Sequence, residues 1–315
     1  MQSGSSCFGA DCSKAEVVIA CDGHDPVIEL PNRARELRAW LRSLPEPVAL
    51  AVESTGRDHM VLANLAHRLG HRVYVLDPLR VRRYAQSTTF RGKTDLSDAR
   101  VIARFLAREQ DSLRPYKPPT PQQRRIDSLL RRRAKLVVMR QQLTTLTRTL
   151  HGHRATLRTT LESLGRLIDD IERSADALSH RDARTAERCD RLRTIVGIGR
   201  VTSIAIANLF DRVPFDTADK AVAFVGLDPR PSDSGDHRGR RRITKRGSPE
   251  HRRLLHNAAM AAARTALWRP YYERSRQRGL ASTEALCELA RRLLRTAWAI
   301  DHHQREFDPE RVRIS

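Results

Sequence analysis

The chain has 315 residues and a mass of 35.9 kDa, more than one compact core usually needs, so at least two domains are expected. Lysine and arginine number 58 against 37 acidic residues, which gives a formal charge of +21. This excess predicts a polyanionic partner, and nucleic acid is favoured over a membrane surface because the cations are spread through segments that look folded. No run of about 18 apolar residues is present, so no helix is expected to cross a membrane.

The cysteines are odd in number and scattered along the chain. No pair has the C-x-x-C spacing of structural zinc sites, so all five are predicted to be reduced cytoplasmic thiols. They are Cys7, Cys12, Cys21, Cys189 and Cys287. The first residues also lack the basic start and apolar stretch of a secretory signal.

Residues 1–115 alternate strand and helix signals. Short apolar runs predict strands at 8–12, 17–21, 27–30, 48–52 and 73–76. Apolar residues at helical spacing predict a helix after Asn32, its expected cap, and a second at 60–69 that Gly70 ends. The resulting order, βββαβαβ, predicts an α/β domain with a mixed sheet.

Residues 116–190 form a second predicted region, introduced by four prolines between Pro115 and Pro121. Seven apolar residues recur in strict heptad register: Leu129, Leu136, Leu143, Leu150, Leu157, Leu164 and Ile171. This repeat predicts a coiled-coil linker that joins protomers, interrupted or bent near Gly152. Between Gln122 and Thr160 ten Arg or Lys accompany the single acid Asp127, so this half could lie along phosphates.

Residues 191–315 form the third region, predicted to be mainly α-helical with helices at 249–267 and 283–302. Gly197 and Gly199 resemble the turn of a helix-hairpin-helix, whose backbone N–H groups can approach a phosphate, but a tight turn between packed helices fits equally well. A polar loop follows from Pro229. The predicted nucleic-acid contacts are these two glycines together with Arg238, Arg240, Arg241, Arg242, Lys245 and Arg246.

Four carboxylates form a candidate metal site. Asp11 ends the first predicted strand and Glu53 follows a buried one, so the two converge if these strands are parallel neighbours. Asp95 and Asp98 are spaced i,i+3 at the start of a helix that Thr94 could cap. Four acids facing one point would repel without a cation, and their oxygen ligands suit Mg²⁺. Taken alone, Asp95 and Asp98 would instead be helix-dipole partners and Asp11 a turn residue.

At these residues the chain resembles a known family. The segments 9–14 (GADCSK), 53–56 (ESTG) and 93–99 (KTDLSDA) are similar to the three motifs of the DEDD transposases of the insertion-sequence one-ten type, which include the Piv invertases. The VGIG and FVGLDPRP runs, and Ser234-Gly235 followed by RGRRRITKRG, resemble the second domain of the same family. Ala10 and Cys12 depart from the usual pattern around the first acid, but every expected functional group is present.

The resemblance implies a RuvC-like N-terminal domain of RNase H fold, a coiled-coil linker and a C-terminal transposase domain. It implies Mg²⁺ binding by Asp11, Glu53, Asp95 and Asp98, and a nucleophilic Ser234 that becomes joined to DNA as a phosphoserine. The partners it implies are donor and target DNA, a structured bridge RNA, and further copies of the chain in a dimer or tetramer with composite sites. The expected location is the bacterial cytoplasm, in association with the nucleoid.

Two other functions fit parts of the sequence. One is a RuvC-like nuclease that hydrolyses DNA at the metal site without using Ser234. The other is a non-catalytic coiled-coil protein that binds nucleic acid. This function gives no reason for four acids and a Ser-Gly loop at these positions. Ser232, two residues before Ser234, is an alternative nucleophile on the residues alone.

Overall fold

The computed structural model describes residues 6–24, 26–54, 56–87, 95–146, 153–230 and 242–311, and among these the side chains of 95–97, 230 and 242 are not described. Internal contacts divide the chain into two compact units, Met1–Pro118 and Pro119–Ser315. Both the middle segment 116–190 and the last segment 191–315 of the sequence prediction fall almost wholly within the second unit. The three-part division therefore stays a prediction.

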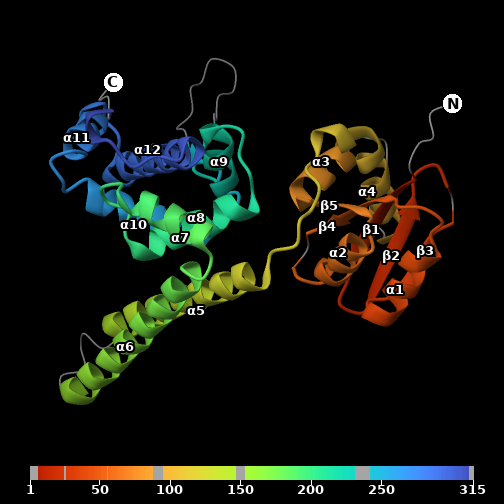
Figure 1. The fold of residues 1–315 in the computed structure, drawn as a ribbon, viewed down its shortest axis with the longest axis horizontal. Helices are drawn as coiled ribbons and strands as arrows, with labels where there is room; N and C mark the ends of the chain where they lie inside the picture. Colours follow the sequence, from red (N-terminus) through yellow and green to blue (C-terminus); the bar gives the residue numbers. More distant parts are fainter. Residues whose placement is uncertain are drawn as a thin grey trace. The chain divides into compact units, whose positions relative to one another are not determined.

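The first unit is built on a five-stranded mixed sheet (Figure 1). Its strand order is β3-β2-β1-β4-β5, where β1, β2 and β3 pair antiparallel and β1, β4 and β5 pair parallel. The strands are β1 (Cys7–Cys12), β2 (Glu16–Cys21), β3 (Ile28–Pro31), β4 (Ala49–Glu53) and β5 (Arg72–Leu76). All five predicted strands are present within two residues of their expected limits, and the α/β class with a mixed sheet is confirmed.

Helices cover both faces of this sheet. On one face α1 (Ala34–Ser43) and α2 (His59–Arg68) pack over residues such as Ala10, Ile19 and Val52. On the other face α4 (Asp95–Glu109) packs over Ala51 and Tyr74, beside α3 (Pro78–Ser87). The alternation of side chains along a strand therefore sorts the sheet into an α1/α2 face and an α3/α4 face. A short 3-10 helix, Gln110–Ser112, follows α4.

Asn32 does not cap the first helix, contrary to the sequence prediction. Arg33 is the residue before α1 and makes no side-chain cap. The Asn32 side-chain amide instead donates to the backbone oxygens of Ser13, at 2.7 Å, and Asp58, at 3.2 Å. Asn32 thus ties the β1–β2 turn to the start of α2, because these long-range acceptors lie within its reach.

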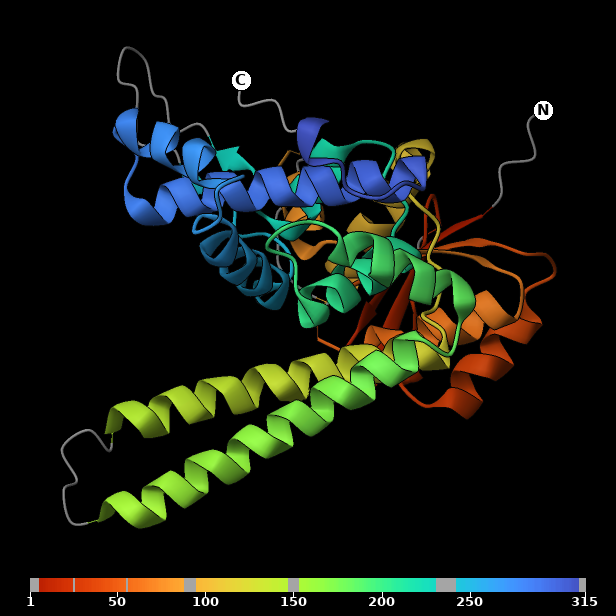
Figure 2. The same cartoon turned by 60° about the vertical axis from the view of Figure 1, so that its left-hand side comes forward.

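The second unit begins with two long helices, α5 (Pro121–Leu146) and α6 (Arg154–Ser179), which lie side by side and run in opposite directions (Figures 1 and 2). The heptad residues are shared between them: Leu129, Leu136 and Leu143 on α5, and Leu157, Leu164 and Ile171 on α6. Leu150 lies outside the described residues. The repeat therefore packs at least in part within one chain, and an intermolecular coiled coil is not confirmed.

The rest of this unit is helical around one large core. Its elements are α7 (Ala183–Arg193), α8 (Arg200–Arg212), α9 (Ala218–Val225), β6 (Pro229–Arg230), β7 (Arg242–Ile243), α10 (Pro249–Ala262), α11 (Arg269–Gln277), α12 (Ser282–His303) and a 3-10 helix at Pro309–Arg311. The helix predicted at 249–267 ends five residues early, since the chain turns after Ala262 and buries Trp268, whose indole N–H donates to the Val196 oxygen at 3.0 Å. In the described ranges, no helix is both long and apolar enough to cross a membrane.

Candidate functional site

Asp11 and Glu53 occupy neighbouring positions on two parallel strands. The register pairs Ala10 of β1 with Val52 of β4, so the next residue on each strand is an acid. Ala10 and Val52 belong to the α1/α2 face. Because side chains alternate along strands, Asp11 and Glu53 both belong to the α3/α4 face, and both are half-buried.

Helix α4 approaches this face most closely at Gly9. A Cβ atom there would lie 2.1 Å from the backbone nitrogen of Ala103 and 2.4 Å from the backbone oxygen of Ala99. Only glycine permits this contact. Asp98 precedes Ala99 on α4, so the close approach at Gly9 brings the helix that carries Asp95 and Asp98 against the strand that carries Asp11.

The pKa of Glu53 depends on the charges of the neighbouring acids. Its pKa is raised above the ordinary value, first by burial and then by the charges of Asp11, Asp98 and Asp77. Asp77 is an acid that the sequence analysis missed. It follows β5 as Glu53 ends β4, and its Oδ1 accepts the backbone N–H of Leu79 at 2.9 Å. Its place directly after a buried strand is the signal that could have found it.

A hard divalent cation fits the chemistry of this donor set. Carboxylate oxygens are its preferred ligands, and a bound cation would relieve the repulsion that raises the Glu53 pKa. Within the described ranges, however, no three His, Cys, Asp or Glu side chains gather into a group that could hold a metal. The Asp95 side chain lies outside those ranges, so the complete four-acid set stays a prediction.

The predicted nucleophile lies in the segment 231–241 between β6 and β7 of the second unit, which is called the serine loop below. Ser232, Ser234, Arg238, Arg240 and Arg241 lie outside the described residues, as does the side chain of Arg242. The loop is held at its ends by the antiparallel pair β6 and β7. Beyond these strands the Thr244 N–H donates to the Asp228 oxygen at 3.0 Å and the Lys245 N–H to the Gly226 oxygen at 3.1 Å.

The antiparallel pair β6–β7, called the ribbon below, is closed at its base, the ribbon root, by two glycines and an arginine. A Cβ at Gly226 would lie 1.8 Å from the Arg246 oxygen, and one at Gly247 would lie 2.0 Å from the Phe224 oxygen. Both glycines have the positive φ that glycine adopts most readily. Arg252 donates from Nη1 to the oxygens of Val225, Arg246 and Gly247 at 3.1, 3.3 and 3.0 Å. Gly226 and Gly247 belong to the two runs that resemble the second domain of the family, whereas Arg252, which positions the same loop ends, lies outside both runs.

The VGIG turn has a packing reason of its own. Gly197 has φ +100°, and its missing Cβ lets the turn pack on α10, where Ala262 Cβ would otherwise lie 2.6 Å away. Gly199 precedes α8, with open space where its Cβ would be. The tight-turn interpretation accounts for Gly197, while contact of Gly197 and Gly199 with nucleic acid stays a prediction.

Two family models match this chain. Residues 8–155 match the DEDD transposase model for IS110 elements, described as "Transposase", and residues 189–273 match the model "Transposase IS116/IS110/IS902 family". The chain belongs to the IS110 family of transposases. The family predicted from the motifs is therefore confirmed, and the protein is an enzyme that acts on DNA. Membership of the DEDD class implies use of a divalent metal ion in general, and the first unit has the mixed sheet expected of a RuvC-like domain.

Several curated proteins resemble this IS110-family transposase over most of their length. The "Pilin gene-inverting protein" of Moraxella bovis is 27% identical, with 87% of each chain covered. The "Probable family 20 transposase" of Pseudomonas aeruginosa is 28% identical, with 82% of this chain and 84% of the relative covered. The "Transposase for insertion sequence element IS1328" of Yersinia enterocolitica is 27% identical, with 93% and 96% covered.

Among solved structures, the transposase matches RuvC of T. thermophilus in complex with a Holliday junction substrate. The identity is 18%, the match covers 35% of this chain and 99% of RuvC, and the TM-score is 0.27.

Proposed function

We propose that this transposase cuts and rejoins donor and target DNA through a phosphoserine at Ser234, assisted by Mg²⁺ at Asp11, Glu53, Asp95 and Asp98. A structured bridge RNA selects the sites, and the enzyme works in the bacterial cytoplasm on nucleoid DNA. The observation that carries the proposal is the register of β1 and β4, which sets Asp11 beside Glu53 on the face that α4 covers.

The chemistry divides between the two units. Serine is a weak nucleophile at neutral pH, and a divalent cation at the four acids would supply the positive charge that activates it and stabilises the phosphate. Ser234 Oγ forms a bond to the scissile phosphorus, the bond from phosphorus to the leaving deoxyribose oxygen breaks, and the serine proton ends on that oxygen. The rejoining step is the same exchange in reverse with a new strand. The cationic run 238–246 is suited to holding the phosphate backbone.

Ser234→Ala is expected to bind DNA and RNA as the parent does but to form no covalent adduct, because one hydroxyl adds little to an interface dominated by phosphate contacts. The measurement is incubation with cognate DNA and guide RNA, then denaturing electrophoresis and peptide mapping. Ser232→Ala is the matched control and should stay active. An adduct that persists in Ser234→Ala, or that maps to Ser232, would overturn the assignment, and Mg²⁺-dependent nicks without an adduct would indicate hydrolysis.

Glu53→Gln is expected to raise the melting temperature in EDTA at pH 7 to 8. A carboxyl whose folded-state pKa is raised lowers stability as pH climbs from the unfolded to the folded pKa, and that deficit persists above it. The uncharged amide removes the deficit. Addition of millimolar Mg²⁺ should stabilise the parent and not the variant.

Glu29→Gln, at an exposed position of β3, is the control and should melt as the parent does with and without the ion. The metal-site proposal fails if Glu53→Gln lowers the melting temperature in EDTA, or if Mg²⁺ stabilises Glu53→Gln as much as the parent.

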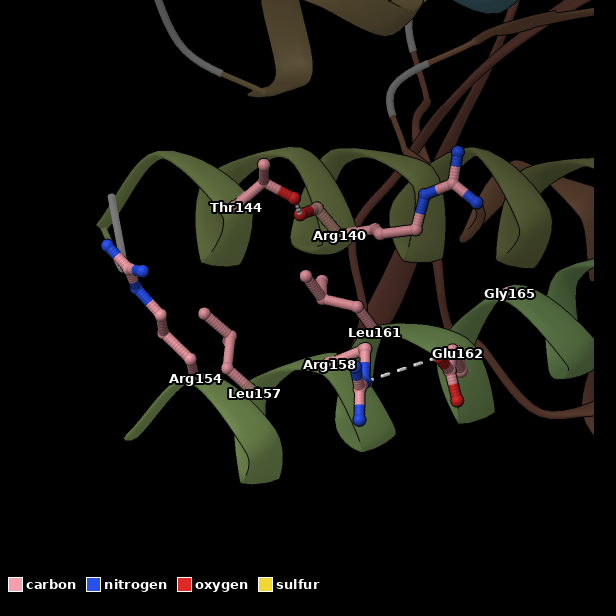
Figure 3. A pocket seen from close by; sticks show the side chains of 8 residues that line it. All are labelled: Arg140, Thr144, Arg154, Leu157, Arg158, Leu161, Glu162 and Gly165. Atoms are coloured by element: carbon pink, nitrogen blue, oxygen red, sulfur yellow. Dashed lines mark hydrogen bonds and ion pairs between the residues drawn. The ribbon is translucent and has the colours of Figure 1, made fainter. Parts of the chain in front are cut away.

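The half of the α5–α6 hairpin formed by the end of α5 and the start of α6 supports association of protomers. Met139, Leu146 and Leu167 are 56%, 73% and 46% exposed there. They line one side of the hairpin, with Leu143 and Leu164, around a groove of about 560 Å³. The other side, drawn in Figure 3, holds Leu157 and Leu161 among charged side chains. Isolated apolar residues on a helix surface are common, but a continuous apolar groove is suited to a second copy.

The double variant Met139→Glu/Leu146→Glu is therefore expected to lower the oligomeric mass, because unpaired carboxylates in a buried seam cost several kcal/mol each. Light scattering at matched concentrations measures it. Gln141→Glu/Thr145→Glu makes the same change of charge at exposed positions outside the groove and should leave the mass unchanged. An unchanged mass in both variants would mean that this side of the hairpin does not join protomers.

A further inference from the structure

A cavity of about 880 Å³ lies at the base of the ribbon that carries the serine loop. One wall is apolar and comes from the ribbon strands and the α11–α12 turn, with Pro229, Ile243 and Leu280. The first half of α12 forms another part of the lining, where Cys287 and Arg291 lie one helical turn apart. Lys245, two residues after β7, completes the rim. The volume is within the range of sites that bury a small molecule or a nucleotide.

The two carboxylates of the cavity are already engaged by the fold. Glu288 Oε2 accepts the Ser275 hydroxyl at 2.6 Å and Arg278 Nη2 at 2.5 Å. Glu284 Oε2 accepts the backbone N–H of Ala281 at 2.8 Å, at the start of α12. Both carboxylates of the cavity therefore already have hydrogen-bond partners within the protein.

Of the three cations that line the cavity, Arg278 is paired with Glu288, but Lys245 and Arg291 are not engaged in this way. Neither Lys245 nor Arg291 forms an ion pair with any residue that the structure describes. Lys245 is held at φ +54°, an uncommon conformation for a residue with a side chain, and its N–H is tied to Gly226. Two cations without ion-pair partners at one cavity favour an anionic ligand there.

We propose that this cavity takes one unpaired nucleotide of a single-stranded nucleic acid, its phosphate held by Lys245 and Arg291 and its base packed against Pro229, Ile243 and Leu280. Apolar walls of this kind accept the faces of unstacked bases, whereas a simple anion site would not need them. The inference rests on the proposed function only in expecting such a strand near the serine loop. The strand can be DNA or guide RNA, which share this chemistry.

Cys287 provides a reporter inside the cavity, since its thiol is free and half-buried. The full-length Ser234→Ala protein is treated with a maleimide, and the modification of each cysteine is followed by peptide mass spectrometry. An oligothymidylate of about ten nucleotides, within the usual site sizes, is expected to slow labelling of Cys287 by about tenfold. Labelling of Cys21, half-buried in the other unit, should not change. An oligouridylate in a parallel arm shows whether RNA competes.

Lys245→Gln/Arg291→Gln should abolish this protection, because each lost charge-assisted contact weakens binding by about tenfold. Arg295→Gln removes the same kind of charge from α12 at an exposed position paired with Asp219, outside the cavity, and should keep it. If the double variant labels faster than the parent without oligonucleotide, its fold is altered and Lys245→Gln alone, at an exposed position, decides the test.

The inference is overturned if neither oligonucleotide protects Cys287, or if the variant without both cations keeps full protection. It is equally overturned if protection rises with protein concentration in the absence of nucleic acid, since a second copy would then fill the cavity. The result is independent of the serine assignment, because no adduct is needed for protection. Adduct formation by the parent with an unprotected Cys287 would refute the nucleotide cavity alone.

Discussion

Gly9→Ala is expected to lose DNA cleavage by about 100-fold or more and to destabilise the first unit by about 1–3 kcal/mol, the range for overpacked sites. The added Cβ would lie 2.1 Å from Ala103 N, 2.4 Å from Ala99 O and 2.7 Å from Ile102 C. All three are backbone atoms of α4, so the whole helix must move. The shift carries Asp98 away from Asp11 and Glu53. Urea denaturation and a Mg²⁺-dependent cleavage assay measure the two effects.

Gly165→Ala is the control, because its Cβ would meet only the flexible end of Arg140, at 3.7 Å. It lies within α6, where alanine is favoured over glycine by up to about 1 kcal/mol, so a small gain in stability is expected. Parental cleavage by Gly9→Ala would mean that the contact between α4 and β1 does not set the geometry of the acids.

Gly226→Ala is expected to destabilise the second unit by about 3 kcal/mol or more and to abolish adduct formation, since a left-handed conformation alone costs a residue with a Cβ about 1–2 kcal/mol. Gly226 has φ +77°, and a Cβ there would lie 1.8 Å from the Arg246 oxygen and 2.5 Å from its nitrogen. The strands that hold the serine loop must separate, and the contacts of Arg252 with the ribbon root are lost with them. Thermal denaturation and adduct yield measure the result.

Gly70→Ala is the matched control, because it places a side chain on a residue with positive φ without a steric clash. Gly70 has φ +89°, and nothing lies within 4 Å of the position that its Cβ would take. It should cost about 1–2 kcal/mol, the conformational share alone, and leave adduct formation intact. Equal losses of stability in the two variants would mean that the ribbon root tolerates a side chain.

Most of the first unit could be predicted from residue order alone. Buried strands such as 49–53 carry β-branched and apolar residues, and turn residues separate them, so the element order βββαβαβ follows from local preferences. Asp11 and Glu53 could be predicted to converge for the same reason, because acids that end neighbouring parallel strands meet at one edge. The prediction that Asn32 caps the first helix was wrong, because its side-chain amide donates to backbone oxygens that are distant along the chain. Local sequence does not show such acceptors.

The sequence by itself determined the family, the α/β class of the first unit and the helical character of the rest, because motifs and apolar periods are local properties. Only the tertiary structure decided how the heptad leucines are used. A stripe of leucines can be buried as well by a second helix of the same chain as by another protomer, and the period is identical in both cases. The chain reversal between α5 and α6 resolves part of that choice.

The same distinction applies to glycine. The sequence shows where a side chain is missing, but not which backbone approaches the gap. Gly9 against α4, Gly197 against α10 and Gly226 against Arg246 are contacts between segments distant along the chain or on opposite sides of a loop. They depend on how complete elements pack, and that packing is what brings the acids of the first unit and the loop ends of the second into position.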